Sequence, residues 1–174
     1  KKNKNSKGLL VIPTGGGKTL TALRAINKLF KKNIITKKVL WVSHLKTLNE
    51  QTSGVIKEQV TAGKFLGKLE PINPMLKNVI TEMVTSSVKR IKENKEDYGL
   101  IVIDEAHHSA SDGYNLLLGS GLPVLGLTAT PTRLDGKELE YRKIIYQTTP
   151  SDLFERKVII RPEIEKISTN LSYN

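Results

Sequence analysis

A short segment near the amino end combines three glycines with a lysine and a threonine. Residues 13–19 read Pro-Thr-Gly-Gly-Gly-Lys-Thr. Glycine permits positive φ angles and has no Cβ atom, so successive backbone N–H groups can turn toward one anion. A lysine here supplies a mobile positive charge for phosphate oxygens, and the next hydroxyl suits Mg²⁺. The sequence therefore predicts a phosphate-binding loop formed by Thr14, Gly15, Gly16, Gly17, Lys18 and Thr19.

The neighbours of this segment favour the phosphate-binding interpretation. An apolar run at residues 9–12 precedes it, and residues 20–26 continue with apolar positions at helical spacing. A strand, a glycine loop and a helix N-terminus in that order form an anion site, because the first N–H groups of the helix are unpaired. The common phosphate-loop pattern has glycine where this chain has Ile12. The alternative interpretation is a glycine-rich turn that merely precedes a helix.

Two adjacent carboxylates follow another apolar run. Asp104 and Glu105 come directly after residues 100–103, Leu-Ile-Val-Ile. A carboxylate at such a strand end can hold Mg²⁺ together with the Thr19 hydroxyl, and the next carboxylate can polarise an attacking water. The alternative is a solvated acidic pair at a strand end. The upstream Gly-Lys-Thr favours the catalytic interpretation, with Lys18, Asp104 and Glu105 as catalytic residues and Thr19 and Asp104 as Mg²⁺ ligands.

Two histidines follow the acidic pair and raise the question of a transition-metal site. The chain has no cysteine, and the third histidine, His44, lies far away in the sequence. Adjacent side chains such as His107 and His108 cannot both face one ion from a regular element. We therefore expect a coupling or packing role beside the carboxylates for these two residues.

These motifs need elements that bring them together. Apolar runs and helical stripes alternate along the chain, which favours an α/β fold: a three-layer, mostly parallel sheet with helices on both faces. In such sheets the ligand site lies at the carboxyl ends of the strands, and the polar motifs follow strands. The expected strands are 9–12, 39–42, 79–84, 99–103, 123–127, 144–146, 158–160 and 164–167. The expected helices are 20–30, one beginning near Leu45, 88–92 capped by Ser86 and Ser87, 114–118, and 151–156.

The charge balance favours a polyanionic partner. The 174 residues include 28 Lys and Arg and 17 Asp and Glu, a formal net charge of +11. Nucleic acid is the obvious partner, and general solubility is the alternative. Without cysteines, a long apolar run or a signal-type segment, we expect a soluble, cytoplasmic, single-domain chain that does not associate with membranes. Both ends look truncated, so we expect a fragment of a larger protein.

Three segments together resemble a known family: Asp-Glu-Ala-His-His-Ser-Ala at residues 104–110, the loop at 13–19, and Gly-Leu-Thr-Ala-Thr-Pro-Thr-Arg at 126–133. They resemble the first RecA-like motor domain of a superfamily 2 helicase. The extended signatures are similar to the DNA-directed branch that contains type III restriction-enzyme helicase subunits, UvrB and Rad25-like helicases. The resemblance covers nearly the whole chain and implies a RecA-like P-loop NTPase fold with ATP and Mg²⁺ as cofactors.

The resemblance also implies residue roles. His107 joins Asp104 and Glu105 in the DEAH box as a further catalytic residue, and Thr128 with Thr130 matches the motif that links nucleotide state to strand movement. The expected nucleic-acid or coupling residues are Ser43, His44, Lys46, Thr85, Ser86, Thr128, Thr130 and Arg133. Relatives usually have His-Arg where this chain has His44-Leu45, and Lys46 could replace that charge. The alternative for residues 43–48 and 85–87 is an ordinary strand-to-helix turn.

The family further implies two parts outside these residues: an upstream segment that recognises adenine, and a second RecA-like domain beyond residue 174 with an arginine finger. Such a finger contributes roughly 10³–10⁵ in rate, so we expect this chain alone to bind nucleotide weakly and hydrolyse it very poorly. The expected function is the amino-terminal motor domain of an ATP-dependent DNA helicase or translocase. The alternatives are an RNA helicase domain, or a non-motor nucleic-acid-binding module or nucleotide switch on the same fold.

Overall fold

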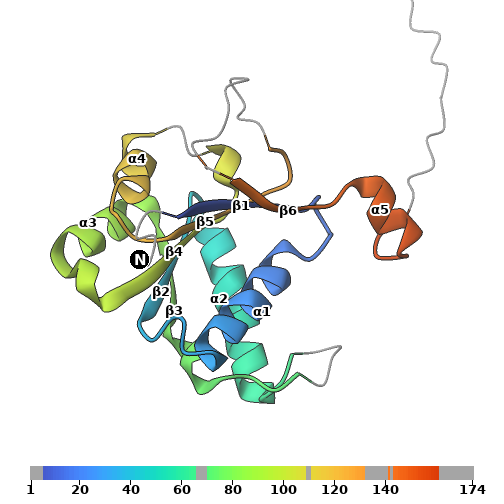
Figure 1. Ribbon diagram of the computed structural model, residues 1–174, viewed down its shortest axis with the longest axis horizontal. Coiled ribbons are helices and arrows are strands. Elements are labelled where there is room, and N and C mark those ends of the chain that lie inside the picture. Colours follow the sequence, from blue (N-terminus) through green and yellow to red (C-terminus); the bar gives the residue numbers. More distant parts are fainter. Residues whose placement is uncertain (1–5, 66–69, 109–110, 132–140, 142, 161–174) are drawn as a thin grey trace, which may run out of the picture.

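Six parallel strands form one sheet in the order β3-β2-β4-β5-β1-β6 (Figure 1). The computed structural model describes residues 6–65, 70–108, 111–131, 141 and 143–160. The strands are β1 (Lys7–Val11), β2 (Lys38–Ser43), β3 (Val79–Met83), β4 (Tyr98–Ile103), β5 (Val124–Thr128) and β6 (Lys143–Gln147). The α-helices are α1 (Lys18–Lys31), α2 (Lys46–Ala62), α3 (Val84–Asn94), α4 (Asp112–Leu118) and α5 (Pro150–Glu155). Short 3₁₀ turns occur at η1 (Pro74–Asn78), η2 (Lys95–Asp97) and η3 (Ala106–His108).

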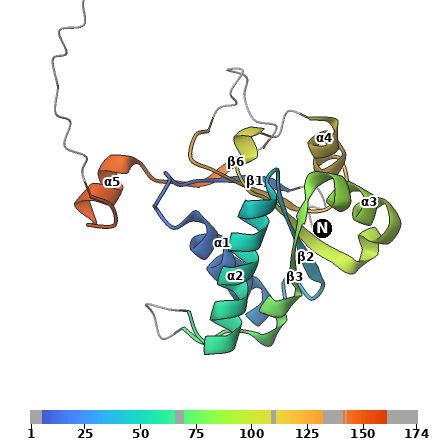
Figure 2. The ribbon, with the colours of Figure 1, turned by 180° about the vertical axis from the view of Figure 1, so that it is seen from behind.

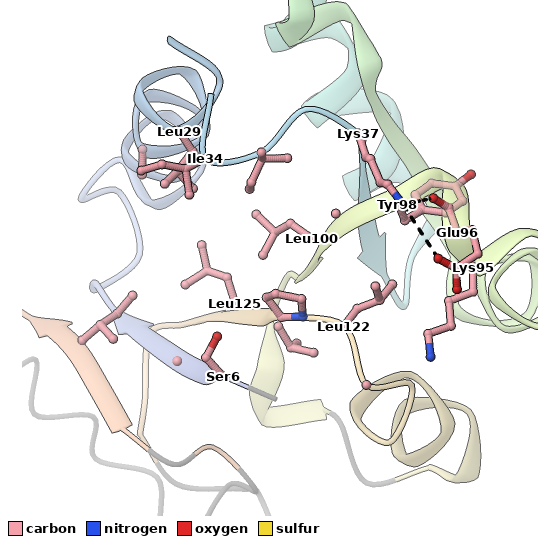
Figure 3. Close-up of a pocket in the computed structure, with 18 residues that line it drawn as sticks. Ser6, Leu29, Ile34, Lys37, Lys95, Glu96, Tyr98, Leu100, Leu122 and Leu125 are labelled. Carbon is pink, nitrogen blue, oxygen red and sulfur yellow. Dashed lines mark hydrogen bonds and ion pairs between the residues drawn. The ribbon is translucent and has the colours of Figure 1, made fainter. Parts of the chain in front are cut away.

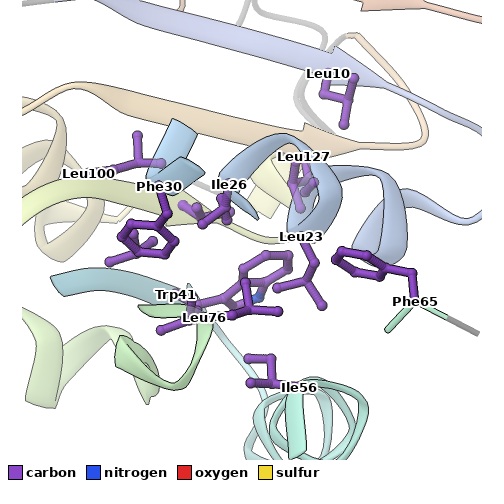
Figure 4. Packing of buried hydrophobic residues seen from close by; sticks show 14 of the residues in the cluster. Leu10, Leu23, Ile26, Phe30, Trp41, Ile56, Phe65, Leu76, Leu100 and Leu127 are labelled. Carbon is purple, nitrogen blue, oxygen red and sulfur yellow. The ribbon is translucent and has the colours of Figure 1, made fainter. Parts of the chain in front are cut away.

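Helices cover both faces of the sheet, which confirms the predicted fold class (Figures 1 and 2). Strand side chains alternate between faces, so each apolar strand contributes residues to two separate cores. On one face, Leu10, Val39 and Trp41 pack with residues of α1 and α2 (Figure 4). On the other face, Leu9 and Leu40 join residues of α3 and α4. Fully apolar strands of this kind are expected where a parallel sheet is buried on both sides.

The predicted start of α3 was wrong. This helix begins at Val84, immediately after β3, so Ser86 and Ser87 lie inside its first turn and do not cap it. Val84 and Val88 both pack against the second core. Burial of that apolar stripe extends the helix toward its amino end, which outweighs the capping preference of serine.

The carboxyl-terminal region differs from its prediction in two places. α5 begins at Pro150, one residue before the predicted helix at 151–156, and its cap is Thr149. Thr149 and Asp152 form a reciprocal capping box. The Thr149 N–H donates to Asp152 Oδ2 at 2.8 Å, and the Asp152 N–H donates to Thr149 Oγ1 at 3.2 Å. Residues 158–160 do not form the predicted strand: residues 158 and 159 are bends, and the Val158 N–H closes the end of α5 by donating to the Leu153 carbonyl. The strand predicted at 164–167 lies outside the described residues.

A cavity of about 810 Å³ opens at the amino ends of the strands, on the side of α1 (Figure 3). Its lining comes from the starts of β1, β4 and β5 and from the residues that follow α1. Leu29, Ile34, Leu100 and Leu125 give it a mainly apolar wall. The glycine loop leaves the opposite, carboxyl end of β1, so this cavity is not the predicted nucleotide site. Among the described residues, no helix is both long and apolar enough to span a bilayer.

Candidate active site

The predicted chemistry-bearing residues gather along one edge of the sheet. The glycine loop follows β1, His44 follows β2, Asp104 follows β4, and Thr128 ends β5. These four strands are neighbours in the order β2-β4-β5-β1. Because all of them are parallel, their carboxyl ends lie at the same edge. Segments separated by about a hundred residues in the sequence therefore meet at one site.

The glycine loop has the backbone that an anion cradle requires. Gly15 and Gly17 have φ angles of 78° and 81°, which residues with a Cβ atom rarely adopt. α1 begins directly after Gly17, and no side chain caps its first N–H groups. Those groups can therefore donate to a bound anion at the positive end of the helix dipole.

Gly16, between the two glycines with positive φ angles, is needed for packing. A Cβ atom on Gly16 would lie 2.7 Å from Ile12 Cγ2, 2.8 Å from Leu153 Cδ1 and 3.0 Å from the Pro13 carbonyl. The loop is thus held against β1 on one side and against α5 on the other. Sequence reasoning missed this contribution of Leu153, because no local pattern connects residue 153 with residue 16.

Lys18 and Glu105 form the central ion pair of the site. Lys18 Nζ lies 2.6 Å from Glu105 Oε1, and the two side chains are 10% and 25% exposed. Lys18 is the first residue of α1, and the carboxylate that it contacts follows β4, which β5 separates from β1 in the sheet. A charge-assisted contact this short in a partly buried setting fixes both groups. The structure therefore brings the loop lysine and the acidic pair to one place.

Glu105 is held in an unusual backbone conformation. Its φ angle is +50°, which costs free energy for a residue with a Cβ atom. Its N–H donates to Asp104 Oδ1 at 3.0 Å, and the Asp104 N–H continues the ladder to β2 by donating to the Val42 carbonyl at 2.8 Å. The turn therefore presents two carboxylates in succession at the end of one strand. Positive φ at a non-glycine residue is an outlier of the kind that occurs at functional sites.

Asp104 is a buried acid. The residue is 5% exposed, and burial raises the pKa of its carboxyl group, with a further increase from the neighbouring charge of Glu105. The positive charge of Lys18 acts in the opposite direction. A nearby divalent cation would favour the ionised form of such a carboxylate.

His107 connects the acidic pair to the end of β5. Its Nδ1 lies 3.1 Å from Thr128 Oγ1 and 3.3 Å from Glu105 Oε2. The Thr128 hydroxyl donates its own hydrogen to the Thr130 carbonyl at 2.7 Å and accepts from the Thr130 N–H at 3.1 Å. Both neighbours of Nδ1 are thus acceptors, so Nδ1 must carry a hydrogen. The imidazole therefore links Glu105 to the turn after β5.

The three histidines of the chain lie in one row. The His44 and His108 ring centroids are 4.3 Å apart, and those of His107 and His108 are 4.2 Å apart, with tilts of 43° and 42°. Burial and the neighbouring His108 lower the pKa of both His44 and His107. Sequence reasoning did not foresee the contact with His44, because it depends on β2 and β4 being neighbours.

The remaining predicted residues fall into different surroundings. Ser43 is fully buried, and its hydroxyl donates to the Leu45 carbonyl at 2.9 Å, so this side chain shapes the turn after β2. Lys46 is exposed beside Glu50. Thr85 and Ser86 are exposed in the first turn of α3, at the β3 edge, which lies two strands from β4. Arg133 lies outside the described residues.

The residues at this edge fit a magnesium-bound nucleoside triphosphate. Thr19 and Asp104 supply the hard oxygen donors that Mg²⁺ prefers, while Lys18 and the uncapped N-terminus of α1 supply the positive groups for phosphate. Within the described ranges, no group of three or more His, Cys, Asp and Glu side chains could hold a metal by itself. The donor set is therefore one that would share a cation with a phosphate ligand.

Residues 1–133 match the family model described as "Type III restriction enzyme, res subunit". The chain is 30% identical over 179 residues to DNA 3'-5' translocase XPB2 of Sulfurisphaera tokodaii, covering 97% of this chain and 38% of that protein. It is 28% identical over 185 residues to putative ATP-dependent helicase IRC3 of Saccharomyces cerevisiae, covering 92% of this chain and 26% of that protein. The chain thus spans well under half the length of these relatives.

The fold is also similar to the helicase domain of Hef from Pyrococcus furiosus. That similarity has a TM-score of 0.55 at 25% identity and covers 82% of this chain and 36% of the Hef chain. The parallel sheet covered by helices on both faces agrees with this structural similarity. The chain belongs to the type III restriction enzyme res-subunit family and is the first RecA-like domain of a superfamily 2 helicase.

Proposed function

We propose that this domain binds ATP with Mg²⁺ at the carboxyl edge of its sheet and drives movement along DNA. The observation that carries the proposal is the 2.6 Å contact between Lys18 Nζ and Glu105 Oε1. It joins the loop after β1 to the acid after β4, two groups that phosphoryl transfer needs at one place. The family resemblance supports ATP as the nucleotide.

Each residue then has a distinct role. The loop N–H groups and Lys18 bind the phosphates, and Lys18 exchanges the Glu105 carboxylate for phosphate oxygens when nucleotide enters. Thr19 and Asp104 would hold Mg²⁺, which offsets phosphate charge when it is bound. Glu105, released by Lys18 and kept beside His107, orients the attacking water. His107 transmits the position of Glu105 to Thr128 and Thr130.

Nucleic acid would bind beside this site. The net charge of +11 favours a polyanion, and exposed Lys46, Thr85 and Ser86 follow strands β2 and β3 at the same edge. Arg133 remains a proposed contact. DNA is favoured by the similarity to a protein named a DNA translocase, and RNA is the alternative because phosphate contacts do not distinguish the two. Stimulation of ATP hydrolysis by single-stranded DNA but not by RNA, in a protein that carries this domain with its neighbours, would support the proposal.

Hydrolysis would require a second RecA-like domain beyond residue 174. The coverage of 38% and 26% of two relatives leaves room for such a domain. Its arginine finger would contribute roughly 10³–10⁵ in rate, so the present chain should turn over ATP very slowly. Turnover by this chain at the rate of a complete helicase would contradict that part of the proposal.

Nucleotide binding can be tested directly on this chain by titration with a fluorescent ATP analogue, with and without Mg²⁺. We expect Lys18→Ala to abolish most binding. Glu105→Gln should retain binding and, in the complete protein, lose nucleic-acid-stimulated hydrolysis. Normal stimulated hydrolysis in either variant would refute the assignment. A protein that binds nucleotide and nucleic acid but whose complete form never hydrolyses ATP would instead support the alternative, a nucleotide switch without motor activity.

A further inference from the structure

The histidine row joins two parts of the proposed machinery through side-chain rings. His44 belongs to the turn after β2, where nucleic acid is proposed to bind. His107 contacts Glu105 and Thr128, where nucleotide is proposed to act. His108 lies between them, with ring centroids 4.3 Å from His44 and 4.2 Å from His107. The two turns are also joined by the backbone ladder of β2 and β4, which the Asp104 N–H extends by donating to the Val42 carbonyl at 2.8 Å.

The His108 ring lies where a movement of the turn after β2 can be passed to His107. All three residues are half-buried, so the rings have limited room to turn independently. His44 Nδ1 is buried and makes no hydrogen bond in the described part of the chain. His44 therefore meets the site through its ring, with its centroid 4.3 Å from that of His108. A movement of the β2 turn would press His44 on His108, and His108 on His107.

We infer that His108 is a positioning residue that couples the nucleic-acid-binding turn after β2 to Glu105 by ring contact through His44 and His107. This inference rests on the proposed function, because it assigns a path between the two proposed ligands. It gives the second histidine of the DEAH-His sequence a role distinct from that of the first. His107 holds Glu105 directly, whereas His108 acts only through its two neighbours.

The small number of histidines makes the contact path from His44 through His108 to His107 observable by NMR. The three residues of the row are the only histidines among the 174 residues, so an NMR spectrum of the imidazole C–H groups contains only their signals. Single substitutions His44→Ala, His107→Ala and His108→Ala assign them. We expect a short oligo(dT) to shift the His44 signal and, through His108, the His107 signal. We expect Mg²⁺ with the non-hydrolysable analogue AMP-PNP to shift His107 and, through His108, His44.

The decisive variants are His108→Ala and the ring-retaining His108→Phe. In His108→Ala, each ligand should bind with unchanged affinity and still shift the nearer histidine, and the shift of the farther histidine should be lost. His108→Phe should restore the farther shift, since the proposed contact needs a ring and not a titratable group. If His108 only packs, His108→Ala should change the free energy of unfolding, measured in urea. Each ligand should then still shift both the nearer and the farther histidine.

Several outcomes would overturn the inference. One is a farther shift that persists at full size in His108→Ala. Another, which needs no variant, is a wild-type chain in which oligo(dT) moves His44 and leaves His107 unmoved. If backbone amide signals show that the wild-type chain binds neither probe, the proposed function fails and the inference fails with it. If both bind without a farther shift, only the inference fails.

Discussion

The two ends of the sheet differ in almost every physical respect. At the carboxyl end, charged groups are paired, an acid is buried, and Glu105 has a positive φ angle. At the amino end, an apolar cavity of about 810 Å³ lies beside α1, with the ion pair of Lys37 and Glu96 exposed at its margin. The comparison indicates that the carboxyl end concentrates paired and buried charged groups, whereas the amino end contributes apolar burial. A substitution at the amino end should therefore change stability and leave nucleotide affinity unchanged. A substitution at the carboxyl end should mainly change nucleotide affinity.

The largest expected effect is a loss of stability from the amino end. Leu100 is 6% exposed in the first core and also lines the cavity. Leu100→Ala removes buried methyl groups at a place that is already poorly filled, and should lower the free energy of unfolding by about 2–5 kcal/mol. Urea unfolding measures this change. Nucleotide affinity of the folded fraction should stay at the wild-type value, and a parallel loss of affinity would break the comparison.

The converse test is Lys18→Ala at the carboxyl end. Hydrogen bonds to charged groups contribute about 1.5–3 kcal/mol, so nucleotide affinity should fall about ten- to a hundred-fold. Unfolding free energy should change much less than in Leu100→Ala, because the ion pair with Glu105 is partly solvated. Lys31→Ala is the matched control, since Lys31 is the exposed last residue of the same helix. Titration with a fluorescent ATP analogue should distinguish the two variants, and equal losses would count against a specific phosphate contact.

A smaller contrast is expected between one glycine at each end of the sheet, Gly16 and Gly99. A Cβ atom at Gly16 would meet the Pro13 carbonyl at 3.0 Å as well as two side chains, so Gly16→Ala should displace the loop. We expect a loss of about 1–3 kcal/mol in stability together with weaker nucleotide binding. At the amino end, a Cβ atom at Gly99 would meet the Ile35 side chain at 3.0 Å. Ile35 borders the cavity and can move into it, so Gly99→Ala should cost less and leave binding unchanged. Thermal unfolding and nucleotide titration of both variants test this contrast.

The smallest expected effect is a dependence on pH near neutrality, and it belongs to the carboxyl end alone. Burial and His108 lower the pKa of His44 and His107 below 6.5. As pH falls below about 6.5, the unfolded state binds protons that the folded state does not, so the free energy of unfolding should fall. Urea unfolding near pH 7.5 and near pH 5.5 measures the slope, and His44→Phe should make it shallower. The raised pKa of Asp104 acts in the opposite direction, because the folded state then binds a proton that the unfolded state does not. A slope unaffected by His44→Phe would show that other groups titrate.

The candidate site was predictable where one local segment contains all the requirements. The glycine loop could be recognised because strand, glycines, lysine and helix are contiguous, and the structure gives Gly15 and Gly17 the expected positive φ angles. The start of α3 could not be recognised, because it depends on burial of Val84 against another element. The same holds for the packing of Leu153 on the loop. Periodicity describes one segment at a time, and these features depend on which segments become neighbours.

The sequence by itself determined the alternation of strands and helices, the residue types at the strand ends and the family. Apolar period and glycine conformation are local properties, and they are present in the chain before it folds. Only the tertiary structure decided that the order β2-β4-β5-β1 sets Lys18 against Glu105 and His44 against His108. The order of strands in a parallel sheet follows from how the helices between them pack on its two faces, and packing is a property of the whole folded chain.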